Sequence, residues 1–219
     1  MKQRALYSLL ILLLFSCLLA WLQPSTPAVS QASRWQKISP QGQRLTPWQG
    51  PWACVWDKQN KRLWEVKTDN ENIHDGYWSY SWWQQTEAGL ERGAANLGDC
   101  YFESTRCDSQ DLVRRANQQR LCNVAGWRLP QIEELQSLLQ SNDRAQQAKM
   151  AVDYFPHIKA GDYWSADHSQ ALAGAYQHLG QGALAINFYS GDITPLPYRN
   201  AAFVLLVSDQ APAGVEMTQ

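Results

Sequence analysis

Gly-Trp-Arg-Leu-Pro-Gln-Ile-Glu-Glu-Leu, residues 126–135, is the stretch of sequence that decides the fold. Pro130 suits the first position of a helix, because no backbone N–H is needed there. Glu133 and Glu134 fall in the first turn, where carboxylates favour the helix dipole. The apolar residues that recur at helical spacing are Ile132, Leu135, Leu138 and Leu139. The stretch therefore predicts a turn that leads into a helix, ended by the polar pair 142–143.

A second helix and a hairpin are predicted upstream of this turn. Asp108 can cap a helix over residues 109–120, with Asp111 three residues further on. Segments 53–57 and 62–67 flank a polar turn and predict a β-hairpin.

Other segments predict short strands. Aromatic and small polar residues alternate over 77–83. Strands are also expected at 163–166 and 183–189, the second followed by a Ser-Gly-Asp turn at 190–192. Residues 201–207 are apolar at every position, which predicts a central strand covered on both faces. Short strands with two helices predict an α+β fold.

The N-terminus has the parts of a secretory signal. A short basic head precedes residues 5–22, which carry no charge, and small residues and prolines follow. The uncharged run is also just long enough to span a bilayer as a retained anchor. Cys17 offers a third possibility, lipidation of the chain. Phe15 argues against it, because this bulky residue stands where a lipoprotein signal usually has a small one. All three predict a periplasmic or secreted chain, with membrane contact only through residues 5–22.

Composition and length predict one domain. We divide the chain into a signal or anchor with linker (1–32), a domain (35–208) and a flexible tail (209–219). The net charge is −1 and no basic block occurs, which argues against nucleic acid as a partner.

Four cysteines follow the N-terminal segment: Cys54, Cys100, Cys107 and Cys122. An even number in an exported chain indicates a disulfide framework, and four cysteines allow three pairings. A local Cys100–Cys107 bridge is the simplest choice. It leaves Cys54–Cys122 to close a long loop, a constraint worth about 4 kcal/mol. Zinc is disfavoured because no Cys-x-x-Cys pair occurs and the histidines are scattered.

Eleven tryptophans in 219 residues suggest a recognition surface as well as a core. Indole faces stack on the apolar faces of sugars, and exposed aromatic clusters mark binding surfaces. The candidate ligand-binding tryptophans are Trp78, Trp82 and Trp83. Trp82 and Trp83 are adjacent, so in a strand one of them is expected to face solvent. The tryptophans expected in the core are Trp64, Trp127 and Trp164.

Several motifs in order carry a resemblance to a known family. They are Trp52-Ala53-Cys54-Val55, Leu63-Trp64-Glu65-Val66-Lys67, Trp127-Arg128-Leu129-Pro130, Phe155-Pro156, Tyr163-Trp164-Ser165, and Ile186-Asn187-Phe188 with Gly191. From about Trp48 to Ser208 the chain resembles the Lcl C-terminal domain family, the C-terminal domain of collagen-like bacterial adhesins. The resemblance implies a C-type-lectin-like fold and surface adhesion, with sugar-containing ligands in some members.

Two departures from the family bear on structure and function. Gln131 stands where threonine is usual after the proline, which predicts a weaker helix cap. No collagen-like Gly-x-y array precedes the domain.

Calcium would need oxygen ligands, which the sequence offers at Asp162, Asp167, Asn187 and Asp192. No Asp-x-Asp-x-Asp loop occurs, nor do the Glu-Pro-Asn, Gln-Pro-Asp or Trp-Asn-Asp triplets of sugar-binding lectins. We therefore predict solvated loop acids, and neither a metal nor another cofactor. Asn187 stays with the three tryptophans as a candidate ligand-binding residue.

No catalytic residue is predicted. The formylglycine-generating oxidases, which have a related fold, require a reactive cysteine pair in the C-terminal part of the chain, but no cysteine follows Cys122. The Gly-x-Ser-x-Gly elbow of serine hydrolases is also missing from the sequence. His168, near Ser165 and Asp167, is expected to be a loop histidine. Glu133 and Glu134, adjacent on one helix, make a poor acid–base pair.

Together these features predict an exported, non-enzymatic binding or adhesion domain at the cell envelope, with a cell-surface glycan or an envelope protein as partner. The alternative is a structural subunit of a membrane-anchored surface or pilus-like assembly. An enzyme is the third possibility.

Overall fold

The computed structural model describes residues 34–86, 88–100, 106–140 and 147–213. Its strands are β1 (Trp35–Ile38), β2 (Cys54–Asp57), β3 (Arg62–Glu65), β4 (Trp83–Gln85), β5 (Glu91–Gly93), β6 (Asp162–Trp164), β7 (Gln170–Ala171), β8 (Gln181–Asn187), β9 (Ile193–Pro197) and β10 (Val207–Ser208). Its helices are α3 (Ser109–Gln119) and α4 (Ile132–Gln136), with the 3-10 helices η1 (Leu121–Asn123) and η2 (Gly174–Leu179). The predicted signal or anchor, Cys17 and the pair 142–143 lie outside the described residues.

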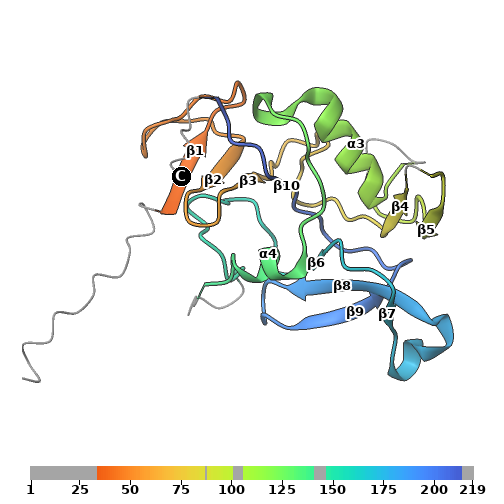
Figure 1. The fold of residues 1–219 in the computed structure, drawn as a ribbon. Helices are drawn as coiled ribbons and strands as arrows, with labels where there is room; N and C mark the ends of the chain where they lie inside the picture. The colour runs from red at the N-terminus through yellow and green to blue at the C-terminus, as the bar shows by residue number, and fades with distance from the viewer. Residues whose placement is uncertain (1–33, 87, 101–105, 141–146, 214–219) are drawn as a thin grey trace, which may run out of the picture. The chain divides into compact units, whose positions relative to one another are not determined.

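The strands form two four-stranded sheets and one separate hairpin (Figure 1). One sheet has the order β1-β2-β3-β10 and is antiparallel throughout; its β2–β3 pair is the hairpin predicted over 53–67. In the other sheet, β8 pairs antiparallel with β6, β7 and β9. The separate hairpin is β4–β5. Antiparallel strands with few helices make the fold α+β, as the sequence predicts.

The segment 77–83 does not form the regular strand predicted for it. Its backbone makes three single bridges, each to a different part of the chain: Ser79 to Asp99, Tyr80 to Ala202 and Ser81 to Asp108. Among the described residues, no single neighbour runs alongside the segment. Of its aromatic residues, Tyr80 and Trp82 are buried, whereas Tyr77 is exposed. Regular pairing begins only at Trp83, in β4.

The apolar segment 201–207 separates two buried cores. Its even-numbered residues 202, 204 and 206 belong to one cluster, while Leu205 and Val207 belong to the other. Alternation along an extended chain sends successive side chains to opposite sides. The prediction that this segment is covered on both faces is confirmed, but only Val207 lies in a regular strand.

Both predicted helices are present, although the second differs in its start and ends earlier than predicted, at Gln136. α3 is capped by Asp108, as predicted. α4 begins after Gln131, so the prediction that Pro130 opens the helix is wrong. The Pro130 carbonyl instead accepts a hydrogen bond from the Ala166 N–H at 2.7 Å. Glu134 strengthens the start of the helix, because its Oε2 accepts a hydrogen bond from the Gln131 N–H at 2.8 Å.

Two disulfides join the four cysteines as the simplest pairing predicts. Cys54–Cys122 spans 68 residues and ties β2 to η1, while Cys100–Cys107 closes a short loop before α3. Such bridges persist in oxidising compartments, which fits an extracellular or periplasmic protein. Within the described ranges, no helix combines the length and the apolarity that crossing a membrane requires.

Glu65, at the end of β3, is a fully buried carboxylate. Its Oε1 lies 3.0 Å from Lys67 Nζ and 2.6 Å from His74 Nδ1. Its Oε2 accepts a hydrogen bond from the Leu206 N–H at 3.0 Å. Burial by itself would raise the pKa of Glu65, but Lys67 and the hydrogen bond with His74 outweigh it and lower the pKa to about 2. The carboxylate therefore joins β3, the loop after it and the segment that enters β10.

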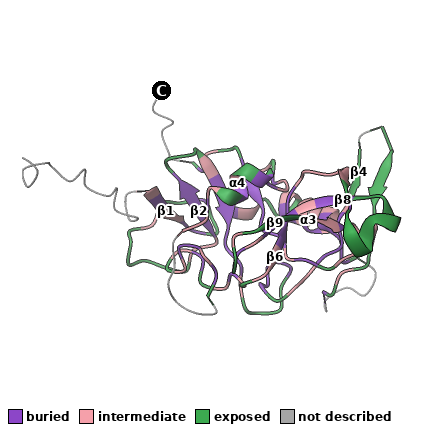
Figure 2. Ribbon diagram, turned by 90° about the horizontal axis from the view of Figure 1, so that it is seen from below, coloured by how far each residue is buried: buried purple, intermediate pink, exposed green. Residues whose placement is uncertain are grey.

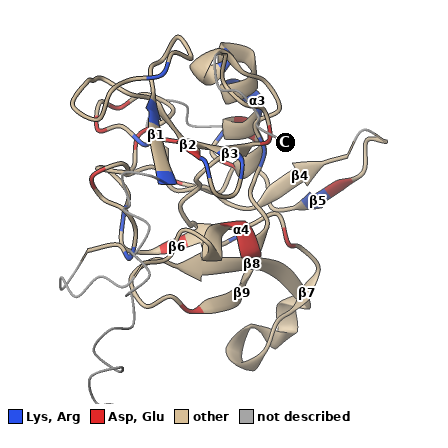
Figure 3. Ribbon diagram, turned by 60° about the vertical axis from the view of Figure 1, so that its left-hand side comes forward, with Lys and Arg blue, Asp and Glu red and all other residues tan. Residues whose placement is uncertain are grey.

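A second charged network surrounds the start of α4, whose two acids form its red segment in Figure 3. Glu134 lies 2.7 Å from Arg128 Nη1 and 2.8 Å from Arg62 Nε. Asp209 joins both guanidiniums, at 2.9 Å and 3.0 Å. Burial raises the pKa of Glu134, yet the two arginines lower it to about 2. Asp209 belongs to the segment predicted as a flexible tail, so that segment is anchored at its first residue.

We expect Glu65→Gln to destabilise the domain. The amide keeps the shape of the side chain but leaves the Lys67 ammonium buried without a counter-charge, a change that typically costs about 3–5 kcal/mol. Urea unfolding followed by circular dichroism measures the loss. Glu133→Gln removes an exposed acid from α4 and serves as the matched control, with little change expected. Equal stability of the two variants would contradict the role given to Glu65.

Stability should fall in acid. The folded-state pKa of Glu65 is lowered from 4.5 to about 2, so its contribution is full above 4.5 and is lost as the pH drops towards 2. Glu134 acts in the same direction and window. Unfolding free energies measured from about pH 6 down to about pH 3 should decrease, and Glu65→Gln should flatten the profile. A flat profile for the unaltered protein would contradict this expectation.

Loss of the long-range disulfide should lower stability. Replacing both Cys54 and Cys122 with alanine frees a long loop in the unfolded chain, which the chain-entropy account puts at about 4 kcal/mol. The same double replacement at Cys100 and Cys107 is the control, and a smaller loss is expected because that loop is short. Equal losses, read from urea midpoints, would show that loop length does not set the effect.

Candidate functional site

Most of the tryptophans serve the core rather than the surface. The buried ones are Trp35, Trp56, Trp64, Trp82, Trp127 and Trp164. The core positions predicted for Trp64, Trp127 and Trp164 are thereby confirmed. Only the other tryptophans that the structure describes can offer an indole face to a ligand.

Trp82 and Trp83 face different surroundings. Trp82 is completely buried, its Nε1 donates a hydrogen bond to the Ser165 carbonyl at 2.8 Å, and its ring centroid lies 5.0 Å from that of Tyr198. Its expected part in ligand binding is therefore wrong, because no face of the ring is open. Trp83 is only half-buried. The expectation that one of the two reaches solvent is confirmed, and that residue is Trp83.

The other two candidate residues, Trp78 and Asn187, form hydrogen bonds with backbone groups close to them in the chain. Trp78 packs on the edge of one core cluster, and its Nε1 donates to the Asn72 carbonyl at 2.8 Å. Asn187 shapes the turn after β8, where its Oδ1 accepts hydrogen bonds from the Tyr189 and Ser190 N–H groups at 2.9 Å and 3.1 Å. The structure does not bring either residue into the pocket that Trp83 lines.

The acids considered for calcium do not converge. Asp162 Oδ1 accepts a hydrogen bond from Asn187 Nδ2 at 2.8 Å, and Asp167 Oδ2 accepts one from the Ile132 N–H at 2.7 Å. Among the residues that the structure describes, no three His, Cys, Asp or Glu side chains are grouped so as to hold a metal ion.

His168 and Ser165 are held by different partners. Ser165 Oγ donates to the Leu184 carbonyl at 3.0 Å, while His168 Nδ1 lies 2.9 Å from Ser169 Oγ. Burial and the neighbouring Arg92 guanidinium lower the pKa of His168. The two side chains that a serine hydrolase would pair are thus engaged elsewhere.

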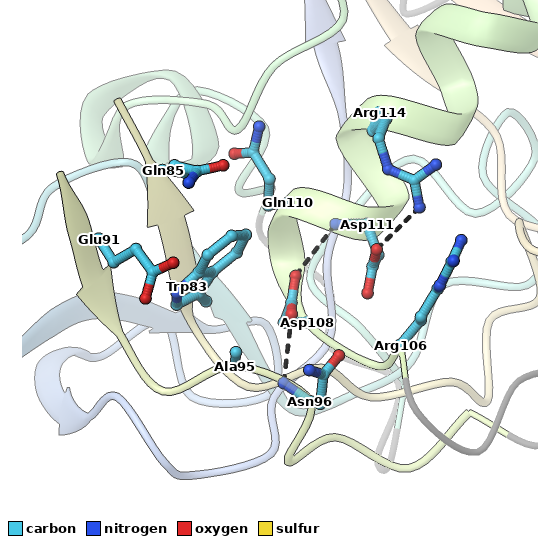
Figure 4. Close-up of a pocket in the computed structure, with 10 residues that line it drawn as sticks. All are labelled: Trp83, Gln85, Glu91, Ala95, Asn96, Arg106, Asp108, Gln110, Asp111 and Arg114. Carbon is cyan, nitrogen blue, oxygen red and sulfur yellow. Dashed lines mark hydrogen bonds and ion pairs between the residues drawn. The ribbon is translucent and has the colours of Figure 1, made fainter. Parts of the chain in front are cut away.

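The candidate site is a pocket of about 560 Å³ between the β4–β5 hairpin and the first turns of α3 (Figure 4). The residues that line it are Trp83, Gln85, Glu91, Ala95, Asn96, Arg106, Asp108, Gln110, Asp111 and Arg114. The hairpin side of the pocket is exposed, as the green colour of the outer hairpin in Figure 2 shows. One aromatic ring therefore faces a wall of amides, carboxylates and guanidiniums.

Trp83 is fixed from both sides. Ser109, the first residue of α3, accepts a hydrogen bond from the Trp83 N–H at 3.1 Å and donates one to its carbonyl at 2.8 Å. On the other side, Gly93 pairs with Trp83 in the hairpin, with φ of +102°. A Cβ at Gly93 would lie 2.2 Å from the Trp82 carbonyl oxygen, so only glycine permits this approach. The backbone that carries the Trp83 ring is thus held where the hairpin meets the helix.

The polar wall is ordered by its own contacts. Asp108 accepts hydrogen bonds from the Asp111 and Asn96 N–H groups at 3.1 Å and 3.2 Å, and burial raises the pKa of Asp108. Asp111 Oδ1 lies 2.9 Å from Arg114 Nη2. Asp111 Oδ2 is buried and finds no hydrogen-bond partner among the described residues. Buried oxygens are normally bonded, so a buried carboxylate oxygen without a partner is unusual.

A second and smaller pocket, of about 230 Å³, lies against the same Trp83 and Gln110. The two pockets therefore meet at one indole and one amide.

The comparisons with known proteins give one match. A family model described as the Lcl C-terminal domain covers residues 53–208. The chain belongs to the Lcl C-terminal domain family. A search of curated proteins and a search of solved structures found no match.

The motifs that carry the family resemblance are structural in this chain. Glu65 and Lys67 form the buried charged cluster, and Arg128 with Glu134 forms the network at the start of α4. The pocket lies in a different part of the matched span, between Trp83 and α3. Membership of the Lcl C-terminal domain family thus accounts for the scaffold.

Sequence reasoning found Trp83 but missed the polar wall. The sequence assigns Asp108 and Asp111 to the start of a helix, and no motif contains Asn96 or Arg106. Spacing carries no signal for this site, because the hairpin and the helix meet only in the folded chain. An adjacent pair of tryptophans ahead of a capped helix was the one available hint.

Proposed function

We propose that this domain is an exported, non-enzymatic binding module that holds a glycan in the Trp83 pocket at the cell envelope. The observation that carries the proposal is a half-buried indole set against amide, carboxylate and guanidinium side chains. A sugar ring offers an apolar C–H face and pairs of hydroxyl groups. An indole matches the first, and planar polar groups match the second.

Family and disulfides support the location and the class of the module. The Lcl C-terminal domain match suggests a surface-associated domain, and the two disulfides fit an oxidising compartment. The C-type-lectin-like architecture implied by the resemblance is part of the same proposal, supported by the α+β arrangement and the two bridges. Sugar recognition by such a domain needs no covalent chemistry.

The contacts of two of the three pocket acids, Asp108 and Asp111, favour binding over catalysis. The carboxylate of Asp108 caps α3, and one carboxylate oxygen of Asp111 forms an ion pair with Arg114. Groups held in this way can orient hydroxyl groups. They are poorly placed to take up and release protons, which a general acid or base must do.

A glycan array probed with the oxidised full-length chain tests the proposal. Trp83→Ala should weaken binding by about thirtyfold or more, since loss of a buried aromatic anchor typically costs at least about 2 kcal/mol. Trp48→Ala is the matched control, because Trp48 is 95% exposed and lines neither pocket. Binding of the control should equal that of the unaltered chain.

Two results would overturn the proposal: no glycan bound above background, or binding that Trp83→Ala leaves unchanged. An envelope protein recovered as the specific ligand would favour the protein version of the binding role. The membrane-anchored structural subunit would be favoured by two results together. Mass spectrometry would place the mature N-terminus at Met1, and the protein would be found assembled into a multi-subunit structure.

A further inference from the structure

The second pocket differs in chemistry from the first. Its apolar lining residues are Trp83, Val113, Leu129 and Ala166, and its polar ones are Gln84, Ser109, Gln110, Arg128 and Gln131. The first pocket, in contrast, is lined mainly by charged side chains and amides. Trp83 thus lies where a polar pocket meets a small, largely apolar recess.

The single guanidinium at the second pocket is already neutralised. Arg128 Nη1 lies 2.7 Å from Glu134 Oε2, and Arg128 Nη2 lies 2.9 Å from Asp209 Oδ1. These hydrogen bonds raise the pKa of Arg128 and keep it paired. The recess therefore suits a neutral group and gives an anion no unpaired positive partner at this arginine.

A hydroxyl group would fill this recess poorly. Water left against Val113 and Leu129 cannot form its full set of hydrogen bonds, and an apolar group that displaces such water gains affinity. A group with a methyl, a carbonyl and an N–H would satisfy both the apolar wall and the glutamine amides. On a sugar ring, the acetamido group has this combination.

Building on the proposed function, we propose that the second pocket takes the acetamido group of an N-acetylated amino sugar whose ring lies on Trp83. The ring hydroxyls then face the first pocket, where the side-chain amide of Asn96 can bond them. Gln110 lies at both pockets and can bond either part of the sugar. The ligand class is therefore a glycan that contains N-acetylhexosamine.

Calorimetric titration of the oxidised full-length chain tests this inference with two neutral trisaccharides. One is tri-N-acetylchitotriose, and the other is cellotriose, which has hydroxyl groups in place of the acetamido groups. The acetylated sugar should bind at least about tenfold more tightly, the range expected for one methyl group in an apolar pocket. A muramyl-containing disaccharide provides a further arm, and its affinity relative to chitotriose distinguishes cell-wall from other N-acetylated glycans.

Val113→Thr is the decisive variant. It keeps the shape of the side chain but makes the recess polar, so the preference for the acetylated sugar should fall several-fold while cellotriose binding stays the same. Val152→Thr is the matched control, since Val152 is also half-buried and lines neither pocket. Thermal unfolding of both variants confirms that the fold is retained. If Val113→Thr unfolds, Leu129→Met is measured instead and should alter the preference without removing Trp83-dependent binding.

The outcomes separate this inference from the proposed function. Equal affinity for the two trisaccharides, with both lost in Trp83→Ala, would overturn the acetamido assignment and leave glycan binding in place. An acetylated preference that survives Val113→Thr would also overturn the assignment. Failure of every sugar to bind would overturn both.

Discussion

The fold depends on one buried carboxylate. Glu65 is fully enclosed, and its two oxygens are shared among Lys67, His74 and the Leu206 N–H. A charge in this position is tolerated only because each partner is present, since an unpaired buried ion is very costly. The contact with Leu206 joins β3 to the segment that separates the two cores, so one side chain ties the first sheet to the centre of the molecule.

That central segment in turn supports the site. Ala202 bridges to Tyr80, three residues before Trp83, and the Tyr80 carbonyl accepts a hydrogen bond from the Trp164 indole at 2.7 Å. The chain therefore leaves a fixed core at Trp82 and emerges as the β4–β5 hairpin with Trp83 at its base. An aromatic ring on a rigid base loses little freedom when it binds a ligand, which favours affinity.

Several features could be predicted from the sequence because each depends on neighbouring residues or on a whole-family pattern. The cap at Asp108 and the β2–β3 hairpin are local, and the pairing of Cys100 with Cys107 follows from their closeness in the chain. One local prediction failed because a distant residue intervenes. Pro130 suits the first turn of a helix, but a hydrogen bond from Ala166, far along the chain, engages its carbonyl and shifts the helix start to the residue after Gln131.

By itself, the sequence determined the α+β class, the disulfide framework and the family, since composition, periodicity and motif order are properties of the linear chain. Only the tertiary structure decided which tryptophan is a candidate for ligand binding. Trp82 and Trp83 are chemically identical neighbours, and their difference arises from Tyr198 and Ser165 on one side and the open edge of α3 on the other. Burial and pocket shape come from the meeting of distant segments, and no spacing rule encodes that meeting.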